Sequence, residues 1–406
     1  MQKITITLPT YWARKFGEIG SPRDSIFDHP TPMDKTGTLP RCLESLTGLK
    51  SHDFQVLIIT APVSPELAGE AEAGVERIIS PFRKHFPIIQ FGVSDLMFAR
   101  ESLERQGLDG ELLNLNSYPN IRNCQLIGAH VLGSELIAAV DDDEIVPEDF
   151  LTAAAEYTGT VYKGKRVDGK AGVYLNREGD FKISETSELR SASNLFIKKA
   201  CLINDTFSSL LYAAGRIVET SIALGGNMVF SRELFTAVPH DPNITRGEDI
   251  DYLINSRMLG FHWFFDRKLC ITHLPPGAAA GDPLNTTPLA KMQQDVIRFI
   301  YQKEKIRLSL NMDGIKAVRA EELGVYPGEF LKPGVEEQAL IALQDKRPPD
   351  ADESFFPRPA ELLVLARRQA EKAGAYFDFA KKWPGIMDIL GSDPVMRNHL
   401  LRKSGL

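Results

Sequence analysis

Short apolar runs alternate with segments of helical spacing along the first 140 residues of the chain. Apolar runs of about five residues are too short for buried helices and are typical of parallel strands buried on both faces. Strands that alternate with helices favour a mostly parallel α/β sheet flanked by helices. In chain order, the strand and helix candidates are residues 4–8, 39–46, 55–59, 66–84, 88–93, 120–136 and 136–140.

Proline and glycine mark the boundaries within the chain. Pro9 is expected to end the first strand, and the many Gly and Pro residues of 10–38 predict a long loop. A segment rich in Pro, Gly and Ala at 275–288 is predicted to be a linker or a mobile loop. We therefore expect an α/β domain over residues 1–285 and a mainly helical C-terminal region over residues 286–406.

The pattern changes after residue 150. Glycine-rich turns over residues 160–183 predict antiparallel hairpins. The later part of the chain returns to alternating strand and helix patterns and then becomes mostly helical. The further elements that we expect are strands at 226–230 and 261–272 and helices at 248–259, 289–309 and 359–383.

Composition argues against several classes of protein. The chain has 406 residues and a formal net charge of −7, whereas a protein that coats nucleic acid would carry a basic excess. Its four cysteines lie far apart without a CxxC pair, which indicates a reduced cytoplasmic protein rather than a zinc framework or a disulfide scaffold. The first residues alternate like a strand and not like a signal peptide, and no apolar stretch approaches the roughly 18 residues of a membrane span.

Four acidic residues follow the apolar run at 136–140 without a break. Asp141, Asp142, Asp143 and Glu144 repel one another, and such a cluster is costly unless a cation neutralises it. Carboxylate oxygens suit Mg²⁺ or Mn²⁺, and alternation at a strand end lets Asp141 and Asp143 converge while Asp142 faces away. A solvated turn or an acidic helix start is the alternative.

Several motifs resemble a known family when they are taken in order. They are residues 39–46, the Arg122-Asn123 pair, the strand that ends in Asp141-x-Asp143, residues 226–235, and residues 247–251 followed by Gly260. This ordered set resembles the family 2 nucleotide-sugar glycosyltransferases, which have a GT-A (Rossmann-like) fold. The resemblance covers about residues 3–275. It implies that Asp141 and Asp143 hold a divalent cation, Mn²⁺ or Mg²⁺, that bridges the two phosphates of a nucleoside-diphosphate sugar.

The resemblance also implies roles for later residues. Asp249 would be the general base that takes the proton of the acceptor hydroxyl, with Glu248 as a supporting carboxylate. His273, at the end of a strand, would be a third metal ligand, and imidazole beside two carboxylates favours Mn²⁺ over Mg²⁺. Read alone, Glu248 and Asp249 also fit the acidic first turn of a helix, and His273 also fits a structural role.

The donor is expected to lie between the first strand and the acidic run. Tyr11 or Trp12 can stack on a base or can pack the loop that follows. The family usually has an acid after its second strand that helps to bind the nucleobase of the donor, but residues 59–64 carry none. The sequence therefore does not indicate which nucleobase the donor carries. Segment 274–288 is a candidate lid. The residues expected to contact the donor are Pro9, Thr10, Tyr11, Arg122, Asp141 and Asp142, with Arg190 and Arg246 as further candidates for anion contacts.

The sequence thus predicts a metal-dependent glycosyltransferase. We expect it to transfer a hexosyl group from a nucleoside-diphosphate sugar to a hydroxyl-bearing acceptor. A nucleotidyltransferase acting on a sugar phosphate is one alternative, although residues 9–14 lack the Gly-rich basic loop that it would need. A non-catalytic sugar-nucleotide-binding protein is the other. The C-terminal helices are expected to bind the acceptor, to form a homo-oligomer or to brace the catalytic domain.

Overall fold

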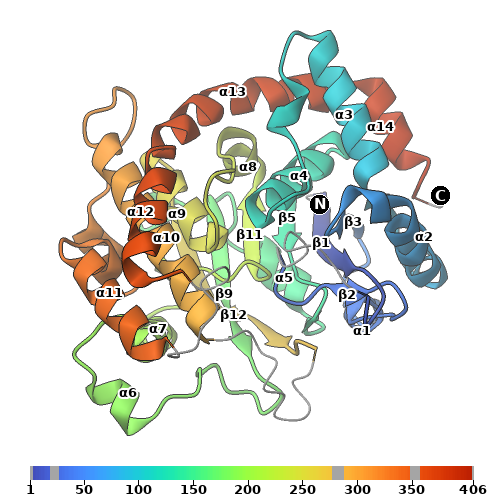
Figure 1. The fold of residues 1–406 in the computed structure, drawn as a ribbon. Helices are drawn as coiled ribbons and strands as arrows, with labels where there is room; N and C mark the ends of the chain where they lie inside the picture. The colour runs from blue at the N-terminus through green and yellow to red at the C-terminus, as the bar shows by residue number, and fades with distance from the viewer. Residues whose placement is uncertain (1–2, 19–26, 277–287, 348–356, 405–406) are drawn as a thin grey trace.

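A mixed sheet of ten strands forms the centre of the fold (Figure 1). The computed structural model describes residues 3–18, 27–276, 288–347 and 357–404. The strands of the sheet are β1 (Ile4–Ala13), β2 (Thr31–Pro32), β3 (Phe54–Pro62), β4 (Ile88–Phe91), β5 (Leu136–Ala139), β6 (Glu144–Ile145), β9 (Gly169–Leu175), β10 (Ile217–Glu219), β11 (Met228–Ser231) and β12 (Trp263–His273). They lie in the order β10-β12-β9-β11-β5-β1-β3-β4, with β2 beside β1 and β6 beside β12.

Most neighbouring strands in this sheet are parallel. Among the described strands of this ten-stranded sheet, the antiparallel pairs are those that include β6, β10 or β11. The prediction of a mostly parallel α/β sheet is therefore confirmed. The helices that surround it are α1 (Leu39–Thr47), α2 (Ala68–Ile79), α3 (Val93–Arg105), α4 (Tyr118–Val131), α5 (Phe150–Ala155), α6 (Ser187–Ser191), α7 (Lys199–Leu211), α8 (Arg232–Ala237) and α9 (Glu248–Met258).

The two faces of the sheet are covered by different helices because side chains alternate along each strand. Along β3, Val56 and Ile58 pack with α1, α2 and α5, whereas Leu57 and Ile59 pack with α3, α4 and α8. The prediction of a mainly helical C-terminal region is also confirmed. Its helices are α10 (Pro288–Ser309), α11 (Val335–Lys346), α12 (Pro359–Ala370), α13 (Ala373–Ser392) and α14 (Pro394–Leu401).

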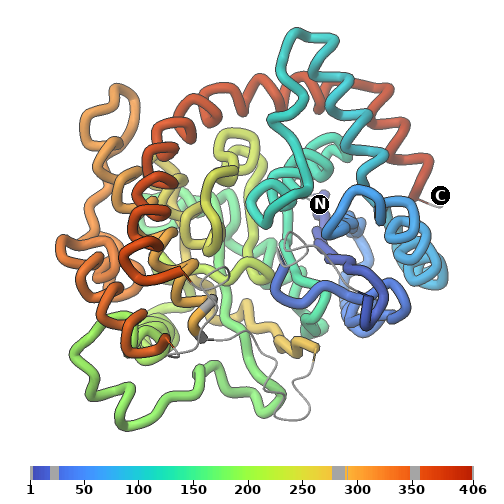
Figure 2. The backbone as a smooth tube through the Cα atoms, in the orientation of Figure 1, coloured from blue at the N-terminus to red at the C-terminus, as the bar shows by residue number. Residues whose placement is uncertain are grey.

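The C-terminal helices pack directly on the sheet layers. In Figure 2 the chain after α12 passes along one side of the molecule, and α13 ends near α3. Trp383 of α13 is fully buried and donates its indole N–H to the carbonyl of Phe235 at 2.9 Å. The predicted boundary at 285/286, the linker and the lid all fall mainly within residues 277–287, which lie outside the described residues.

The expectation that Pro9 ends the first strand is wrong. β1 continues to Ala13 and pairs with β3 along its length, but β5 pairs only with its residues 4–7. Thr7 accepts a hydrogen bond on the β5 side, from the N–H of Val140 at 3.0 Å. Pro9, two residues later, faces that same side beyond the end of β5. Its missing N–H therefore costs no hydrogen bond of the ladder.

The prediction of several hairpins over residues 160–183 is also wrong in part. One hairpin forms there, from β7 (Val161–Tyr162) and β8 (Lys165–Arg166). The next segment becomes β9, which lies between β11 and β12 in the large sheet. Similarly, the helical pattern at 359–383 divides into α12 and α13. These outcomes depend on partners far away in the sequence, which turn patterns do not report.

Helix α3 has no counterpart among the expected elements, because polar residues interrupt its apolar face. Asp95 and Ser102 are both buried on this helix. Asp95 pairs with Lys403 at 2.6 Å and contacts His399 at 2.7 Å, while Ser102 donates to Asp393 at 2.6 Å. The end of the chain thus satisfies the polar side chains of α3.

A buried charge cluster connects α10 to α9. Lys305 of α10 is fully buried, and its ammonium lies 2.6 Å from Asp251 and 2.8 Å from Asp241. Tyr301 also donates to Asp241, at 2.8 Å. Asp251 is fully buried in this cluster. Among the described residues, no helix is both long and apolar enough to cross a bilayer.

We expect Lys305→Met to lower the free energy of unfolding by about 3–5 kcal/mol, because it leaves two buried carboxylates without their cation. Denaturant titration would measure the loss. The matched control is Lys381→Met on α13, where the ammonium lies 3.7 Å from Asp378 and both side chains are exposed. The control should leave stability unchanged. Equal losses of stability in the two variants would contradict a stabilising role for the buried ion pairs of Lys305.

Candidate active site

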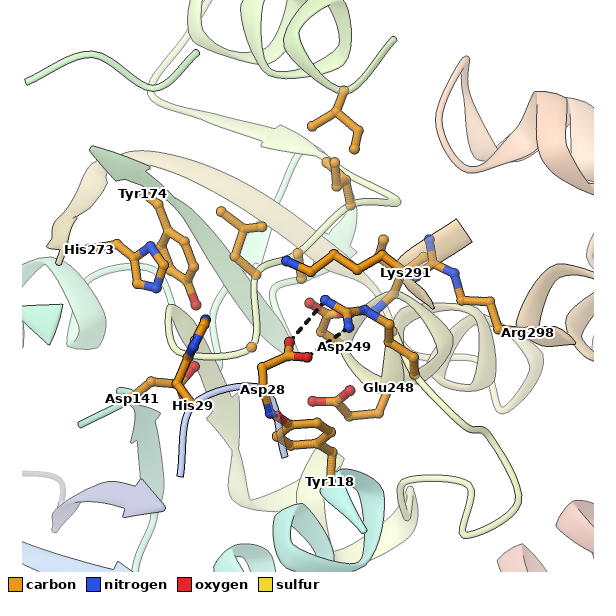
Figure 3. A pocket seen from close by; sticks show the side chains of 18 of the residues that line it. Asp28, His29, Tyr118, Asp141, Tyr174, Glu248, Asp249, His273, Lys291 and Arg298 are labelled. Atoms are coloured by element: carbon orange, nitrogen blue, oxygen red, sulfur yellow. Dashed lines mark hydrogen bonds and ion pairs between the residues drawn. The ribbon is translucent and has the colours of Figure 1, made fainter. Parts of the chain in front are cut away.

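A cavity of about 420 Å³ lies at the carboxyl ends of β1 and β5 (Figure 3). From β1 the chain moves outward through β3 and β4 and then returns to place β5 on the other side of β1. Open α/β sheets bind ligands at such a reversal, because the loops leaving the two strands diverge there. The cavity is lined by the three aspartates of the acidic run, by Glu248 and Asp249, and by His273.

Two of the three aspartates lie beside basic side chains. Asp141 accepts a hydrogen bond from Nη2 of Arg122 at 2.9 Å. Oδ2 of Asp143 lies 3.3 Å from Nε2 of His273. Burial alone would lower the pKa of His273, but the adjacent carboxylates of Asp143 and Asp141 raise it. The ring of His273 also stacks on Tyr174, with centroids 4.9 Å apart, so it has a structural contact as well.

Asp142 has its own set of partners. Its carboxylate accepts hydrogen bonds from the hydroxyls of Thr10 at 2.6 Å and Thr38 at 3.2 Å. Burial raises the pKa of Asp142 to about 7. Strand alternation would turn Asp142 away from the other two aspartates, yet all three line one cavity, because β5 ends at Ala139 and the acidic residues lie in a turn.

Asp143 and His273 fit adjacent ligands of one divalent cation. Two ligand atoms at about 2.1 Å from an octahedral ion lie about 3 Å apart, close to the 3.3 Å between their Oδ2 and Nε2 atoms. The described residues contain no ready-made group of three His, Cys, Asp or Glu donors. Asp141 instead pairs with Arg122, so its part in the predicted ligand set stays a prediction.

Arg122 connects the two acidic motifs. Its side chain on α4 is 6% exposed, with Nη2 on Asp141 and Nε 3.5 Å from Oε1 of Glu248. Burial alone would lower the pKa of the guanidinium, but Asp141 and Glu248 contribute to raising it well above its usual value. One guanidinium, that of Arg122, therefore contacts both the Asp-x-Asp motif and the Glu-Asp motif.

Glu248 and Asp249 begin α9, as the helix-start interpretation predicts, and both also line the cavity. Gly247 precedes them with φ +68°, and a Cβ there would collide with the guanidinium of Arg298. Glycine thus allows α10 to approach the start of α9 closely. Asp249 accepts a hydrogen bond from the N–H of Ile250 at 2.7 Å. Burial raises the pKa of Glu248 to about 7 and also raises that of Asp249.

The residues at the end of β1 contribute unequally to the cavity. Tyr11 lines it and packs on Phe27 and Tyr118, with ring centroids 4.5 and 5.3 Å away. Trp12 is 2% exposed in the core, so the packing alternative applies to it. Thr10 does not line the cavity but donates a hydrogen bond to Asp142, which does. Pro9 is buried in β1 and does not line the cavity.

The sequence interpretation missed most of the far wall. Arg298 and Lys291 project from α10 toward the cavity on the side opposite Tyr174 and His273 (Figure 3). The sequence could have indicated Arg298 and Lys291 only as charged residues on a helix whose apolar stripe includes Ile297 and Ile300. Arg246 pairs with Asp28 at 3.0 Å in the same wall, whereas Arg190 pairs with Glu185 and Asp205 outside it. The other lining residues with polar side chains that the sequence did not indicate are His29, Tyr118, Tyr174, Lys199, Asp295 and Tyr326.

Comparison with known proteins gives matches at the level of structure only. No family model matches the chain, and no curated protein sequence matches it. A mannosyltransferase from Pyrobaculum calidifontis in complex with GDP-Man and Mn²⁺ matches with 13% identity and a TM-score of 0.45, over 98% of this chain and 86% of that one. Glucosyl-3-phosphoglycerate synthase from Mycobacterium tuberculosis matches with 13% identity and a TM-score of 0.34, over 71% and 78%. GalNAc-T7 with UDP, GalNAc and Mn²⁺ matches with 8% identity and a TM-score of 0.38, over 80% and 54%.

These three structures are glycosyltransferases, the class that the sequence motifs resemble. Identities of 8–13% and TM-scores below 0.5 establish neither common descent nor a shared reaction.

The raised pKa of Glu248 predicts a pH-dependent stability difference. A carboxyl whose folded-state pKa is about 7 binds more protons in the folded than in the unfolded state between roughly pH 4.5 and 7. The folded protein therefore loses stability at this position as pH rises through that window. We expect the free energy of unfolding of Glu248→Gln, relative to the wild type, to increase from pH 4.5 to 8. Urea titrations at each pH test this, and a constant difference would contradict it.

Proposed function

We propose that this protein is a metal-dependent glycosyltransferase that moves a sugar, a hexosyl group, from a nucleoside-diphosphate sugar to an acceptor hydroxyl. The observation that carries the proposal is the Arg122 bridge. It draws the strand-end acids and the helix-start acids into one cavity, and the two steps of sugar transfer, release of a diphosphate and activation of a hydroxyl, need such groups side by side.

Asp141, Asp143 and His273 are the residues that would hold the cation. When bound, a divalent cation stabilises the charge that develops on the leaving diphosphate. Arg122 keeps Asp141 oriented toward the cavity, and Tyr174 keeps the imidazole of His273 in place by stacking on it. Thr10 and Thr38 fix Asp142 through their hydroxyls. In this scheme the donor extends from these acids toward Tyr11, which lines the same cavity.

Asp249 would act as the general base. Its position at the start of α9 turns it toward the cavity, near the guanidinium groups that counter its burial, those of Arg298, Arg122 and Arg246. Burial raises the pKa of Asp249, which makes its carboxylate a stronger base than an exposed aspartate. Glu248 would be a supporting carboxylate beside Asp249, with the guanidinium of Arg122 as the partner of its charge.

The nucleotidyltransferase alternative has little support. Residues 9–13 continue β1 as a regular strand instead of forming a Gly-rich phosphate loop. Incubation with a nucleoside triphosphate and a sugar phosphate, with detection of pyrophosphate, separates the two activities. The non-catalytic alternative predicts binding of sugar nucleotides without turnover for any acceptor.

Donor binding should depend on the metal and on Asp143. We expect one member of a UDP- and GDP-sugar panel, together with Mn²⁺, to raise the Tm by about 5 °C at saturating concentration, because a ligand that binds only the folded state stabilises it. Asp143→Asn should abolish the metal-dependent part of the shift. Asp149→Asn, an exposed aspartate just after the acidic run, is the matched control and should behave like the wild type. A full shift in Asp143→Asn would refute the metal assignment.

Removal of the proposed base should separate binding from transfer. We expect Asp249→Asn to reduce kcat by about 10²–10⁴-fold with little change in donor affinity, because the amide cannot take the hydroxyl proton. Donor hydrolysis and acceptor transfer would be followed separately. Asp345→Asn, on α11 and outside the cavity lining, controls for a generic loss of charge. Unchanged turnover in Asp249→Asn would exclude it as the base.

A further inference from the structure

A second and larger cavity, of about 700 Å³, lies on the other side of Tyr326 from the proposed active site. Tyr326 is 3% exposed, lines both cavities, and accepts a hydrogen bond from Arg298 at 2.6 Å. The walls of the second cavity come from α7, the residues after β10, the end of α9, and residues 316–318 and 322–326. None of the residues proposed for sugar transfer lines it.

Arg257 is the unusual group in this wall. It is partly buried, and its guanidinium donates only to two backbone carbonyls, those of Glu322 at 3.2 Å and Thr220 at 3.3 Å. Within the described part of the chain, no carboxylate lies within 4.0 Å of it. Burial lowers the pKa of Arg257, although Glu219 and Glu322 act in the other direction. A guanidinium remains charged in proteins, so two carbonyl acceptors and two more distant carboxylates compensate its desolvation only in part.

The carboxylates of the cavity already have partners of their own. Glu219 pairs with Lys165 at 2.6 Å, and Asp205 pairs with Arg190 at 2.6 Å. Lys316, an exposed residue of the wall, has no carboxylate within 4.0 Å among the described residues. Glu322, the third carboxylate of the wall, accepts a hydrogen bond from the backbone N–H of Arg319 at 3.3 Å. Arg257 and Lys316 are therefore the cations of this wall that have no carboxylate within 4.0 Å among the described residues.

We infer that the second cavity binds a small molecule that carries a phosphate or carboxylate group, with Arg257 as the main anion contact. The hydroxyls of Thr206, Ser209 and Ser221 also line the wall, and hydroxyl groups can bond sugar or phosphate oxygens. Cavities of roughly 300–1,000 Å³ hold ligands of monosaccharide size and above. This inference is independent of the proposed glycosyltransferase activity.

The test is direct binding to the full-length protein without metal or nucleotide. Inorganic phosphate, glucose 1-phosphate and glucuronate would be titrated by calorimetry at constant ionic strength. Glucose 1-phosphate bound more tightly than inorganic phosphate would point to a phosphorylated sugar, and glucuronate bound most tightly would point to a sugar acid. No binding by any of the three would overturn the inference.

Substitutions identify which cavity holds the anion. We expect Arg257→Gln to weaken binding by about tenfold or more, because a charge-assisted hydrogen bond is lost. Arg319→Gln, an exposed arginine outside the cavity lining, is the matched control and should bind like the wild type. Lys316→Ser should also weaken binding, and because this residue is exposed it does not endanger folding. Unchanged affinity in both Arg257→Gln and Lys316→Ser, or loss of affinity in Lys291→Ala instead, would place the anion elsewhere and overturn the assignment.

Discussion

The cavity depends on one buried guanidinium. Arg122 lies between Asp141, which follows β5, and Glu248, which begins α9. The two carboxylates would repel each other without the guanidinium between them. A buried charge is tolerated when it is paired with an opposite charge. Here the guanidinium is the partner of both carboxylates. The same contact brings the end of β5 and the start of α9 together. An ion pair that stabilises the fold therefore also assembles the chemical groups of the site.

A second buried cation performs a similar task behind the cavity. Lys305 neutralises Asp251 on α9 and Asp241 on the preceding loop, so α10 is held against the helix that begins with the proposed base. Gly247 lets Arg298 of α10 reach the cavity wall at the same junction. The C-terminal region thus braces the α/β layers and completes the pocket. Both functions follow from the position of one helix.

The sequence predicted the elements whose signal is local. The parallel strands around β5, the start of α9 at Glu248 and the end of β12 at His273 follow from apolar runs and helix-start patterns. The errors have a common origin. Pro9 continues β1 because β5 has already ended beside it, and α3 buries Asp95 because Lys403, at the far end of the chain, pairs with it. In each case the deciding partner is remote in the sequence.

The sequence by itself determined the layered α/β architecture and the residue types of the candidate site, because periodicity and strand-end acids are written along a single segment. Only the tertiary structure decided which acids meet. It paired Asp141 with Arg122, turned Asp142 to Thr10, and brought Lys291 and Arg298 of a helix without any catalytic motif to the far wall. Charge pairing acts through space over a few ångströms, so chain order alone could not specify these contacts.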